Sequence, residues 1–400
     1  MKLHIAIPLL DELENIPSLL EDISRQGNVD YKVWFCVNQP DAWWQDAERM
    51  AVCRRNAASM DLIREQAAFP FELIDRSSPG KGWQAKKLGV GWARKTLMDA
   101  IMAEASAEDI IISLDGDTRF ESSYFETIAA RMASFPKAPA LSVPYYHPLS
   151  GREAEDRAIL RYELYMRTYL INLFRIESPY AFTALGSAIA MRLSALRTIG
   201  GMTPKKSGED FYLLQKLVKY RPLLQWNTQK VYPAARFSDR VFFGTGPAMI
   251  KGAAGDWSSY PVYPMALFDA INEFYQCIPE LFTRNIPTPV DAVFDDVPLV
   301  WEKLRKNNPA LPQFIKAVHH KFDGLRILQF LKQHPQMQQA DNDRALRELM
   351  QFYAADYSMP KLPRDFSLKT ASVDTLNTIR DYLCSIEDSL RAQADAHYGA

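Results

Sequence analysis

Short apolar runs alternate with amphipathic stretches along the first part of the chain. The runs are rich in β-branched and aromatic residues and end at Pro, Asn, Asp or Gly, so they predict β-strands. Strands that alternate with helices favour an α/β fold, a mainly parallel, Rossmann-like sheet flanked by helices, with ligands at the carboxyl ends of the strands. The predicted strands cover residues 3–7, 31–37, 71–74, 109–114, 140–145 and 184–191. The predicted helices cover residues 14–24, 41–66, 86–105 and 153–176, and another follows Ser122 or Ser123.

The pattern changes after residue 255. Of the 17 glycines, 15 lie at or before Gly255, and glycine collects where loops and tight turns alternate with strands. The sequence therefore predicts two domains, an α/β domain over residues 1–255 and an all-helical domain over residues 256–400. Apolar residues at helical spacing predict helices in the second domain over residues 267–280, 299–306, 312–322 and 372–394.

Charge, cysteine use and hydropathy narrow the functional classes. The chain has 47 Lys and Arg residues against 48 Asp and Glu, so it lacks the overall basic field that draws nucleic acid. The four cysteines show no metal-like spacing and are expected to be reduced thiols. No apolar run reaches the about 18 residues of a membrane span, and the short N-terminal apolar stretch runs into acidic residues, unlike a signal peptide. We therefore expect a cytoplasmic protein without a transmembrane span.

Two aspartates follow the strongest predicted strand. Asp115 and Asp117 flank Gly116 directly after residues 109–114, where a parallel sheet presents its ligands. Carboxylates at positions i and i+2 can reach one face of a loop, and hard oxygen ligands suit Mg²⁺ or Mn²⁺ together with phosphate oxygens and water. The alternative is a polar Asp-Gly turn that merely ends the strand.

A second acidic pair stands at the start of a predicted helix. Glu209 and Asp210 follow Gly208 and precede apolar residues at helical spacing. The positive end of a helix dipole favours carboxylates in the first turn, so this pair is either an ordinary helix start or a candidate for acid–base chemistry. Upstream, Gly186 and Ser187 belong to a segment of flexible backbone.

Basic residues suited to an anionic ligand lie in two further segments. Arg236 and Arg240 are four residues apart with Ser238 between them, and such arginines can clamp a diphosphate. Gly246, which follows, is expected to let this loop move over a ligand. Lys81 lies after the third predicted strand and can meet the same phosphates. A solvated surface loop is the alternative for the arginine segment.

Several common enzyme motifs are incomplete or missing. Residues 89–94 begin like a dinucleotide fingerprint, but Arg94 replaces its final small residue and the segment lies inside a predicted helix. The sequence contains no GxxxxGK[ST] phosphate loop and no GxSxG nucleophile elbow. It therefore disfavours a dinucleotide-dependent enzyme, a P-loop ATPase and an α/β-hydrolase.

Four segments, taken in order, resemble the family 2 glycosyltransferases with the GT-A fold, and the resemblance covers roughly residues 1–250. Residues 5–12 are similar to the family's first strand and turn, although residues 9–12 depart from its usual Tyr-Asn-Glu. Residues 80–82 are similar to its Gly-Lys-x-x-Ala-x-Asn region without the asparagine. The other two segments match its DxD motif and its Glu-Asp motif: Asp115-Gly116-Asp117 and Gly208-Glu209-Asp210.

The resemblance implies a role for each candidate residue. The donor half would cover about residues 1–118 and the acceptor half about residues 119–255. Asp117 would hold Mn²⁺ or Mg²⁺ on the diphosphate of a sugar nucleotide, with Asp115 at the ribose or a metal-bound water. Asp210, or failing it Glu209, would deprotonate the acceptor. The remaining implied residues are Pro8, Asp11, Glu12, Lys81, Arg236, Ser238 and Arg240 for the donor, and Gly186 and Ser187 for the acceptor.

We therefore expect a metal-dependent inverting glycosyltransferase of the hexosyltransferase type that uses a UDP-, GDP- or dTDP-sugar. A retaining glycosyltransferase, a sugar-phosphate nucleotidyltransferase of similar fold and a non-catalytic sugar-nucleotide-binding module stay open as alternatives. The acceptor is unidentified and is either soluble or lipid-linked; a lipid-linked acceptor would place the protein at the inner face of the membrane. The helical tail offers a surface for an oligomer.

Overall fold

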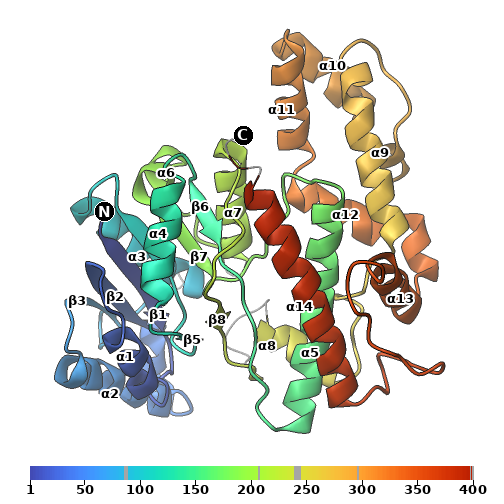
Figure 1. Ribbon diagram of the computed structural model, residues 1–400. Helices are drawn as coiled ribbons and strands as arrows, with labels where there is room; N and C mark the ends of the chain where they lie inside the picture. The colour runs from blue at the N-terminus through green and yellow to red at the C-terminus, as the bar shows by residue number, and fades with distance from the viewer. Residues whose placement is uncertain (85–88, 206–207, 238–244, 295–296, 397, 399–400) are drawn as a thin grey trace. The chain divides into compact units, whose positions relative to one another are not determined.

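The computed structural model describes residues 1–84, 89–205, 208–237, 245–294, 297–396 and 398 (Figure 1). The chain forms two compact units. The first comprises Met1–Ile159, Phe182–Ala254 and Ala394–Ala400, and the second comprises Leu160–Ala181 and Gly255–Gln393. Residues 160–181 therefore belong to the same unit as most of the helical second half of the chain, although they precede it in sequence.

The first unit contains a six-stranded sheet with the strand order β3-β2-β1-β4-β7-β6. The four strands β1 to β4 run parallel to one another, which confirms the prediction of a mainly parallel sheet. Every residue of β1 and β4 is buried, because a parallel sheet carries cover on both faces. The bounds of these strands are β1 (Leu3–Leu9), β2 (Tyr31–Asn38), β3 (Phe71–Arg76) and β4 (Ile110–Ser113).

The remaining strands are short and antiparallel. β7 (Ile189–Arg192) pairs with β4 and with the edge strand β6 (Ala140–Ser142). A separate two-stranded ladder joins β5 (Arg119–Phe120) to β8 (Val231–Tyr232). This ladder matters for the site, because β5 begins just after Asp117 and β8 ends just before Arg236. The helices of this unit are α1 (Ile16–Ser24), α2 (Met50–Gln66), α3 (Val90–Glu104), α4 (Tyr124–Ser134), α6 (Leu193–Thr198), α7 (Glu209–Tyr220) and α8 (Thr245–Ala253).

Three predicted elements begin a full turn or more after the residue at which the sequence predicts their start. The helix predicted from residue 41 is instead a 3₁₀ turn, η1 (Asp41–Gln45), and α2 starts at Met50, because the backbone at Asp46 is extended. The strand predicted over residues 184–191 starts at Ile189. The helix predicted over residues 86–105 begins at Val90, because the backbone of Gly89, with φ of 93°, is not helical; residues 85–88 lie outside the described chain. Gly246, expected in a mobile loop, lies in the first turn of α8.

The second unit is helical, as predicted for the C-terminal part of the chain. One hydrophobic cluster of this unit contains buried side chains of α5, α13 and α14, among them Leu164, Leu346 and Leu383. Predicted helices correspond to α9, α10, α11 and α14, whereas α12 and α13 were not among the predictions. The elements are α5 (Glu153–Arg175), α9 (Met265–Leu281), η2 (Pro289–Ala292), α10 (Val297–Asn307), α11 (Leu311–Lys321), α12 (Gly324–Gln333), η3 (Pro335–Gln339), α13 (Asn342–Phe352) and α14 (Val373–Ala396).

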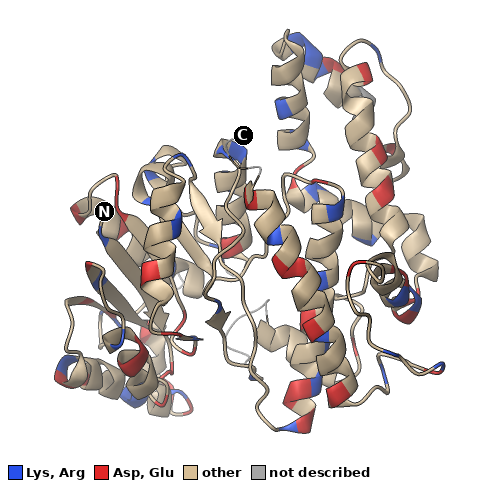
Figure 2. Cartoon of the chain, viewed as in Figure 1, with Lys and Arg blue, Asp and Glu red and all other residues tan. Residues whose placement is uncertain are grey.

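Charge and hydropathy of the folded chain agree with its composition. In the described ranges no helix combines the length and the apolarity that a membrane crossing requires. Figure 2 shows acidic and basic residues interspersed along the helices of each unit. The net charge of −1 thus arises from nearly equal numbers of acidic and basic residues, which occur on helices of both units.

Charged side chains that are almost fully buried join α5 to α14, which lie side by side in Figure 1. Arg167 donates hydrogen bonds to Glu163 at 2.8 Å and to Glu387 at 2.7 Å, and Arg391 donates to Glu387 at 2.8 Å. Burial alone would raise the pKa of Glu387, but the charges of Arg167 and Arg391 hold it below its ordinary value. The free-energy cost of burying each of these charges is offset by the opposite charge beside it, so removal of one partner leaves the other buried and uncompensated.

Replacement of Glu387 tests this network. We expect Glu387→Gln to lower the free energy of unfolding by about 3–5 kcal/mol, because two arginines would stay buried beside a neutral side chain. Since folding lowers the pKa of Glu387, its stabilisation is present at neutral pH and is lost as the pH falls through the acid range. Urea unfolding followed by circular dichroism measures the change.

A matched control removes an exposed pair instead. Glu302 accepts a hydrogen bond from Lys306 on the surface of α10, and Glu302→Gln should leave the unfolding midpoint nearly unchanged, because exposed pairs contribute little. Equal midpoints for Glu387→Gln and wild type would show that the buried network does not hold α14 to α5.

Candidate active site

The loops after β1 and β4 lie against each other. The strands themselves are neighbours, with Ala6 opposite Ser113, so their carboxyl ends meet at the same edge of the sheet. A Cβ on Gly116 would lie 2.6 Å from a methyl carbon of Leu9 and 3.0 Å from Cγ of Glu12. A larger residue here would have to displace the side chains of Leu9 and Glu12, so glycine lets the β4 loop lie close to them.

A single guanidinium holds two carboxylates at this edge. Nη2 of Arg236 lies 2.5 Å from Oε1 of Glu12 and 2.6 Å from Oδ2 of Asp117. Asn15 orients Glu12 by donating to its other oxygen at 2.6 Å. Burial would lower the pKa of Arg236, but the charges of Asp117 and Glu12 raise it above its ordinary value. The structure thus brings together Glu12 and Arg236, which the resemblance assigned to the donor, and Asp117, which it assigned to the metal.

A second guanidinium connects the two acidic motifs. Arg94 of α3 is 5% exposed and forms ion pairs with both Asp115 and Glu209. Burial works against its charge, yet the coulombic attraction of Asp115 and Glu209 raises the pKa of Arg94. Arg94 thus joins Asp115 to Glu209, which lies 115 positions from the arginine in sequence.

Arg94 is the functional residue that the sequence analysis missed. In the sequence Arg94 stands out only as the residue that breaks a dinucleotide fingerprint. The available signal was its place in the helix, because Arg94 lies on the same buried face of α3 as Leu97, Met98 and Ile101. An arginine at a position that faces the core requires carboxylate partners, and the two acidic motifs supply them.

Of the two residues predicted to contact the acceptor, Gly186 and Ser187, the first lies against this arginine. A Cβ on Gly186 would overlap the guanidinium of Arg94, so glycine is required here to admit the arginine side chain. Ser187 is only 2% exposed. Both residues lie in a turn that precedes β7, which begins at Ile189.

Asp210 differs from its neighbour Glu209 in charge environment. Both begin α7, after Gly208 in a left-handed conformation with φ of 73°. Burial and the adjacent charge of Glu209 raise the pKa of Asp210 to about 7, although Arg94 opposes the shift. Within the described chain Glu209 is ion-paired with Arg94, whereas Asp210 forms no ion pair and accepts a 2.8 Å hydrogen bond from the Phe211 N–H. Asp210 is therefore the carboxylate suited to exchange a proton near neutral pH.

The other residues predicted for the β1 segment have local partners. Asp11 adopts a positive φ of 57°, its N–H donates to Asn56 at 2.8 Å, and its carboxylate accepts from Arg55 at 2.5 Å. Pro8 is buried within β1, opposite Cys36 of β2. These contacts fix the shape of the loop that carries Glu12.

Lys81 pairs with a carboxylate outside the two groups that Arg94 and Arg236 hold. Its ammonium group lies 3.1 Å from Asp75 at the end of β3, and its side chain is 61% exposed. Burial would raise the pKa of Asp75, but hydrogen bonds from Ser78, Ser77 and Lys81 hold it well below its usual range. Ser238 and Arg240, also predicted to bind the donor, lie outside the described residues.

The carboxylates at the edge of the sheet are candidate ligands for a divalent metal. Among the described residues no group of three or more His, Cys, Asp and Glu side chains gathers as a metal site would. Glu12 and Asp117 nevertheless converge on one cationic group, Arg236. Because Mg²⁺ is usually bound by one or two carboxylates with phosphate oxygens and water completing the shell, this pair fits a metal that arrives with a diphosphate.

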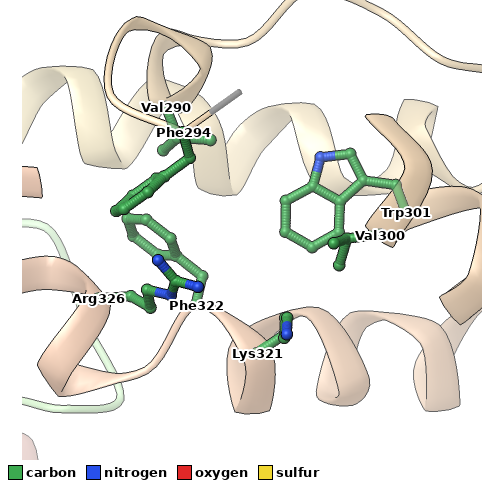
Figure 3. A pocket seen from close by; sticks show the side chains of 7 residues that line it. All are labelled: Val290, Phe294, Val300, Trp301, Lys321, Phe322 and Arg326. Atoms are coloured by element: carbon green, nitrogen blue, oxygen red, sulfur yellow. The ribbon is translucent and has the colours of Figure 1, made fainter. Parts of the chain in front are cut away.

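A pocket of different character lies in the helical unit (Figure 3). In Figure 3 the rings of Phe294 and Phe322 face the side chains of Trp301 and Val300 across it. None of its lining side chains carries a carboxylate, so the pocket offers no acid–base pair of the kind found in the first unit. The seven lining residues are Val290, Phe294, Val300, Trp301, Lys321, Phe322 and Arg326.

Comparisons with known proteins give distant structural similarities. No protein-family model matches the sequence, and no curated protein sequence matches it. The solved structure of S. aureus TarS 1-349 in complex with UDP-GlcNAc is 13% identical, over 99% of this chain and 92% of that one, with a TM-score of 0.42. Glucosyl-3-phosphoglycerate synthase from Mycobacterium tuberculosis, in complex with Mn²⁺, UDP-glucose and glycerol 3-phosphate, is 15% identical, over 64% of this chain and 80% of that one, with a TM-score of 0.36. At such distances the function of this chain rests on its own residues.

Proposed function

We propose that the protein is a metal-dependent, inverting glycosyltransferase that moves a hexosyl group from a nucleoside-diphosphate sugar to an acceptor hydroxyl. One observation carries the proposal: Arg94 ties Asp115, in the motif suited to a metal and diphosphate, to Glu209, beside a carboxylate suited to be a base. Group transfer needs the donor and the base within one site, and this ion-paired arginine supports that arrangement.

The donor would bind at the edge formed by the β1 and β4 loops. Asp117, with Glu12 beside it, would hold Mn²⁺ or Mg²⁺, and the bound metal would neutralise charge that develops on the departing nucleoside diphosphate. Arg236 would meet phosphate oxygens directly, as arginines do in bidentate contacts. We assign Asp11, Pro8, Lys81, Ser238 and Arg240 supporting roles on the donor.

The acceptor would bind on the side of α7. Asp210 would take the proton of the acceptor hydroxyl as its oxygen attacks the anomeric carbon and the bond to the diphosphate breaks. Glu209 would not serve, because its carboxylate is committed to Arg94. Attack opposite to the leaving group inverts the anomeric carbon. Gly186, against Arg94, and Ser187 would line the acceptor side.

The donor can be found without knowing the acceptor. In the presence of Mn²⁺, one of the UDP-, GDP- or dTDP-sugars is expected to stabilise the fold by about 2.7 kcal/mol at a hundredfold excess over its Kd, since ligand binding to the native state adds to stability. Thermal unfolding with and without Mn²⁺ measures this. Asp117→Asn should abolish the additional stabilisation that the donor gives when Mn²⁺ is present. Asp61→Asn, on the exposed surface of α2, should keep this additional stabilisation.

The outcomes separate the remaining possibilities. No stabilisation by any sugar nucleotide would contradict the proposal. Stabilisation by a nucleoside triphosphate and a sugar phosphate would indicate nucleotidyl transfer, and donor binding without turnover on any acceptor or on water would indicate a binding module. Retention of the anomeric configuration would indicate a retaining enzyme that needs no base at Asp210.

A further inference from the structure

The strongest feature that the proposed function leaves unexplained is the sharing of one arginine by two carboxylates. The same nitrogen, Nη2 of Arg236, contacts both Glu12 and Asp117. The side chains of Arg236, Glu12 and Asp117 are 29%, 7% and 17% exposed, respectively. The three charges are therefore largely shielded from water. Two carboxylates this close and this shielded repel each other unless a cation lies between them, and Arg236 provides that cation.

The fold, rather than chance side-chain packing, places this arginine. β5 begins two residues after Asp117, and its Arg119 is opposite Tyr232 of β8. Arg236 follows β8 by four residues and therefore returns to the loop that β5 leaves. On the other side, the close approach at Gly116 sets Glu12 beside the same loop. Three segments distant in sequence thus converge on one cation position.

A divalent metal and this guanidinium compete for the same oxygens. A metal bound at Asp117 and Glu12 would repel a guanidinium left in place, so one cation must give way to the other. A diphosphate that arrives with the metal offers the arginine new oxygen partners of the geometry it prefers. The carboxylates and the arginine would then both stay paired, each with a new partner.

We propose that Arg236 is an exchangeable counter-ion, which occupies Glu12 and Asp117 until metal and nucleoside diphosphate arrive together. This inference rests on the proposed function and adds to it that metal binding depends on the donor. The dependence is reciprocal, because a donor that raises the affinity for the metal is itself bound more tightly with the metal by the same factor. The arginine thereby keeps the empty site from holding the metal by itself.

Removal of the arginine should uncouple the two ligands. The wild type is expected to bind Mn²⁺ weakly alone, and UDP, GDP or dTDP should raise its affinity for Mn²⁺ by a factor within the typical range of about 5–150. Arg236→Gln should bind Mn²⁺ alone more tightly than the wild type, and the nucleotide should then add little. Titration of Mn²⁺ followed by electron paramagnetic resonance measures free and bound metal without any turnover.

Two further variants make the result interpretable. Arg119→Gln removes an arginine two residues after Asp117 that pairs instead with Asp22, at 2.5 and 2.7 Å, and it should bind Mn²⁺ as the wild type does. Arg236→Lys keeps a charge at the site and should keep Mn²⁺ binding weak in the absence of nucleotide. This variant also guards against a glutamine variant that fails to fold, which circular dichroism detects.

The proposal is overturned if Arg236→Gln, while folded, binds Mn²⁺ alone no more tightly than the wild type, or if Arg236→Lys, while folded, binds it clearly more tightly. If the wild type then still binds a nucleotide sugar and transfers the sugar, the exchange is wrong while the proposed function stands. If the wild type binds neither Mn²⁺ nor any of the three nucleotides under any condition, the proposed function fails along with the exchange.

Discussion

Asp210→Asn is expected to lower kcat by roughly 10²–10⁴-fold, the contribution typical of a general base, while donor binding stays unchanged. Asparagine keeps the size of the side chain and removes its capacity to accept a proton. Asp210 also stands outside the ion pair that Arg94 forms with Glu209, so the substitution leaves that pair intact. Steady-state turnover together with donor titration by calorimetry separates the two effects.

The pH dependence follows from the same residue. Because burial and Glu209 raise the pKa of Asp210 to about 7, kcat/KM should rise with pH and level off above that value as the base loses its proton. The free energy of unfolding changes in the opposite direction with pH. A carboxyl group whose pKa is raised in the folded state favours folding at low pH, and this contribution of Asp210 is lost as the pH rises through about 7. Asp210→Asn should remove both dependences.

Glu209→Gln is the matched comparison for this prediction. It neutralises the adjacent carboxylate and removes one partner of Arg94, so it should weaken the site without abolishing the rising limb of the pH profile. It should also move that limb to lower pH, because the charge of Glu209 raises the pKa of Asp210. The assignment of the base is wrong if Glu209→Gln abolishes turnover while Asp210→Asn retains it.

Arg94→Gln is expected to have the second large effect, on stability as well as on turnover. Asp115 and Glu209 would lose the charge that compensates them, and breaking a buried ion pair costs about 3–5 kcal/mol. The rising limb of the pH profile should move to higher pH, since the charge of Arg94 holds the pKa of Asp210 down. A pH profile of kcat/KM and urea unfolding measure the two consequences.

The shift in the pH profile is the result that a merely structural role would not give. Arg64→Gln, which removes an exposed pair with Asp61 on α2, should change neither stability nor the profile. Arg94→Lys keeps the charge but loses the fork that spans two carboxylates, so its pH profile should stay close to that of the wild type while its stability falls. An unchanged profile in a folded Arg94→Gln protein would contradict the positioning role.

The sheet and the acidic motifs could be predicted because their signals are local. The apolar run before Asp115 is a buried strand, and the apolar spacing after Asp210 is a helix, α7, with both carboxylates in its first turn. The glycine between the two aspartates was visible in the sequence, but its reason was not. That reason is the β1 loop, which lies against it.

The partners of the carboxylates could not be predicted, because tertiary structure selects them. Nothing local to Arg94 or Arg236 indicates which acid each one meets. Lys81 is a similar case: its place after a strand favours a phosphate contact, which stays a prediction, but nothing local indicates that its ammonium group pairs with Asp75 at the end of β3. Likewise, nothing local to Arg167 on α5 indicates that its partner is Glu387 on α14.

The anomeric configuration of the first sugar released tests the central claim most directly. Water can replace the unidentified acceptor, so the wild type with an α-linked donor and Mn²⁺ should release free sugar that ¹H NMR detects before it equilibrates. The proposed mechanism predicts the β-anomer, released by the wild type and lost in Asp210→Asn. Release of the α-anomer, or release of either anomer by Asp210→Asn at the wild-type rate, would contradict an inverting transfer in which Asp210 is the base.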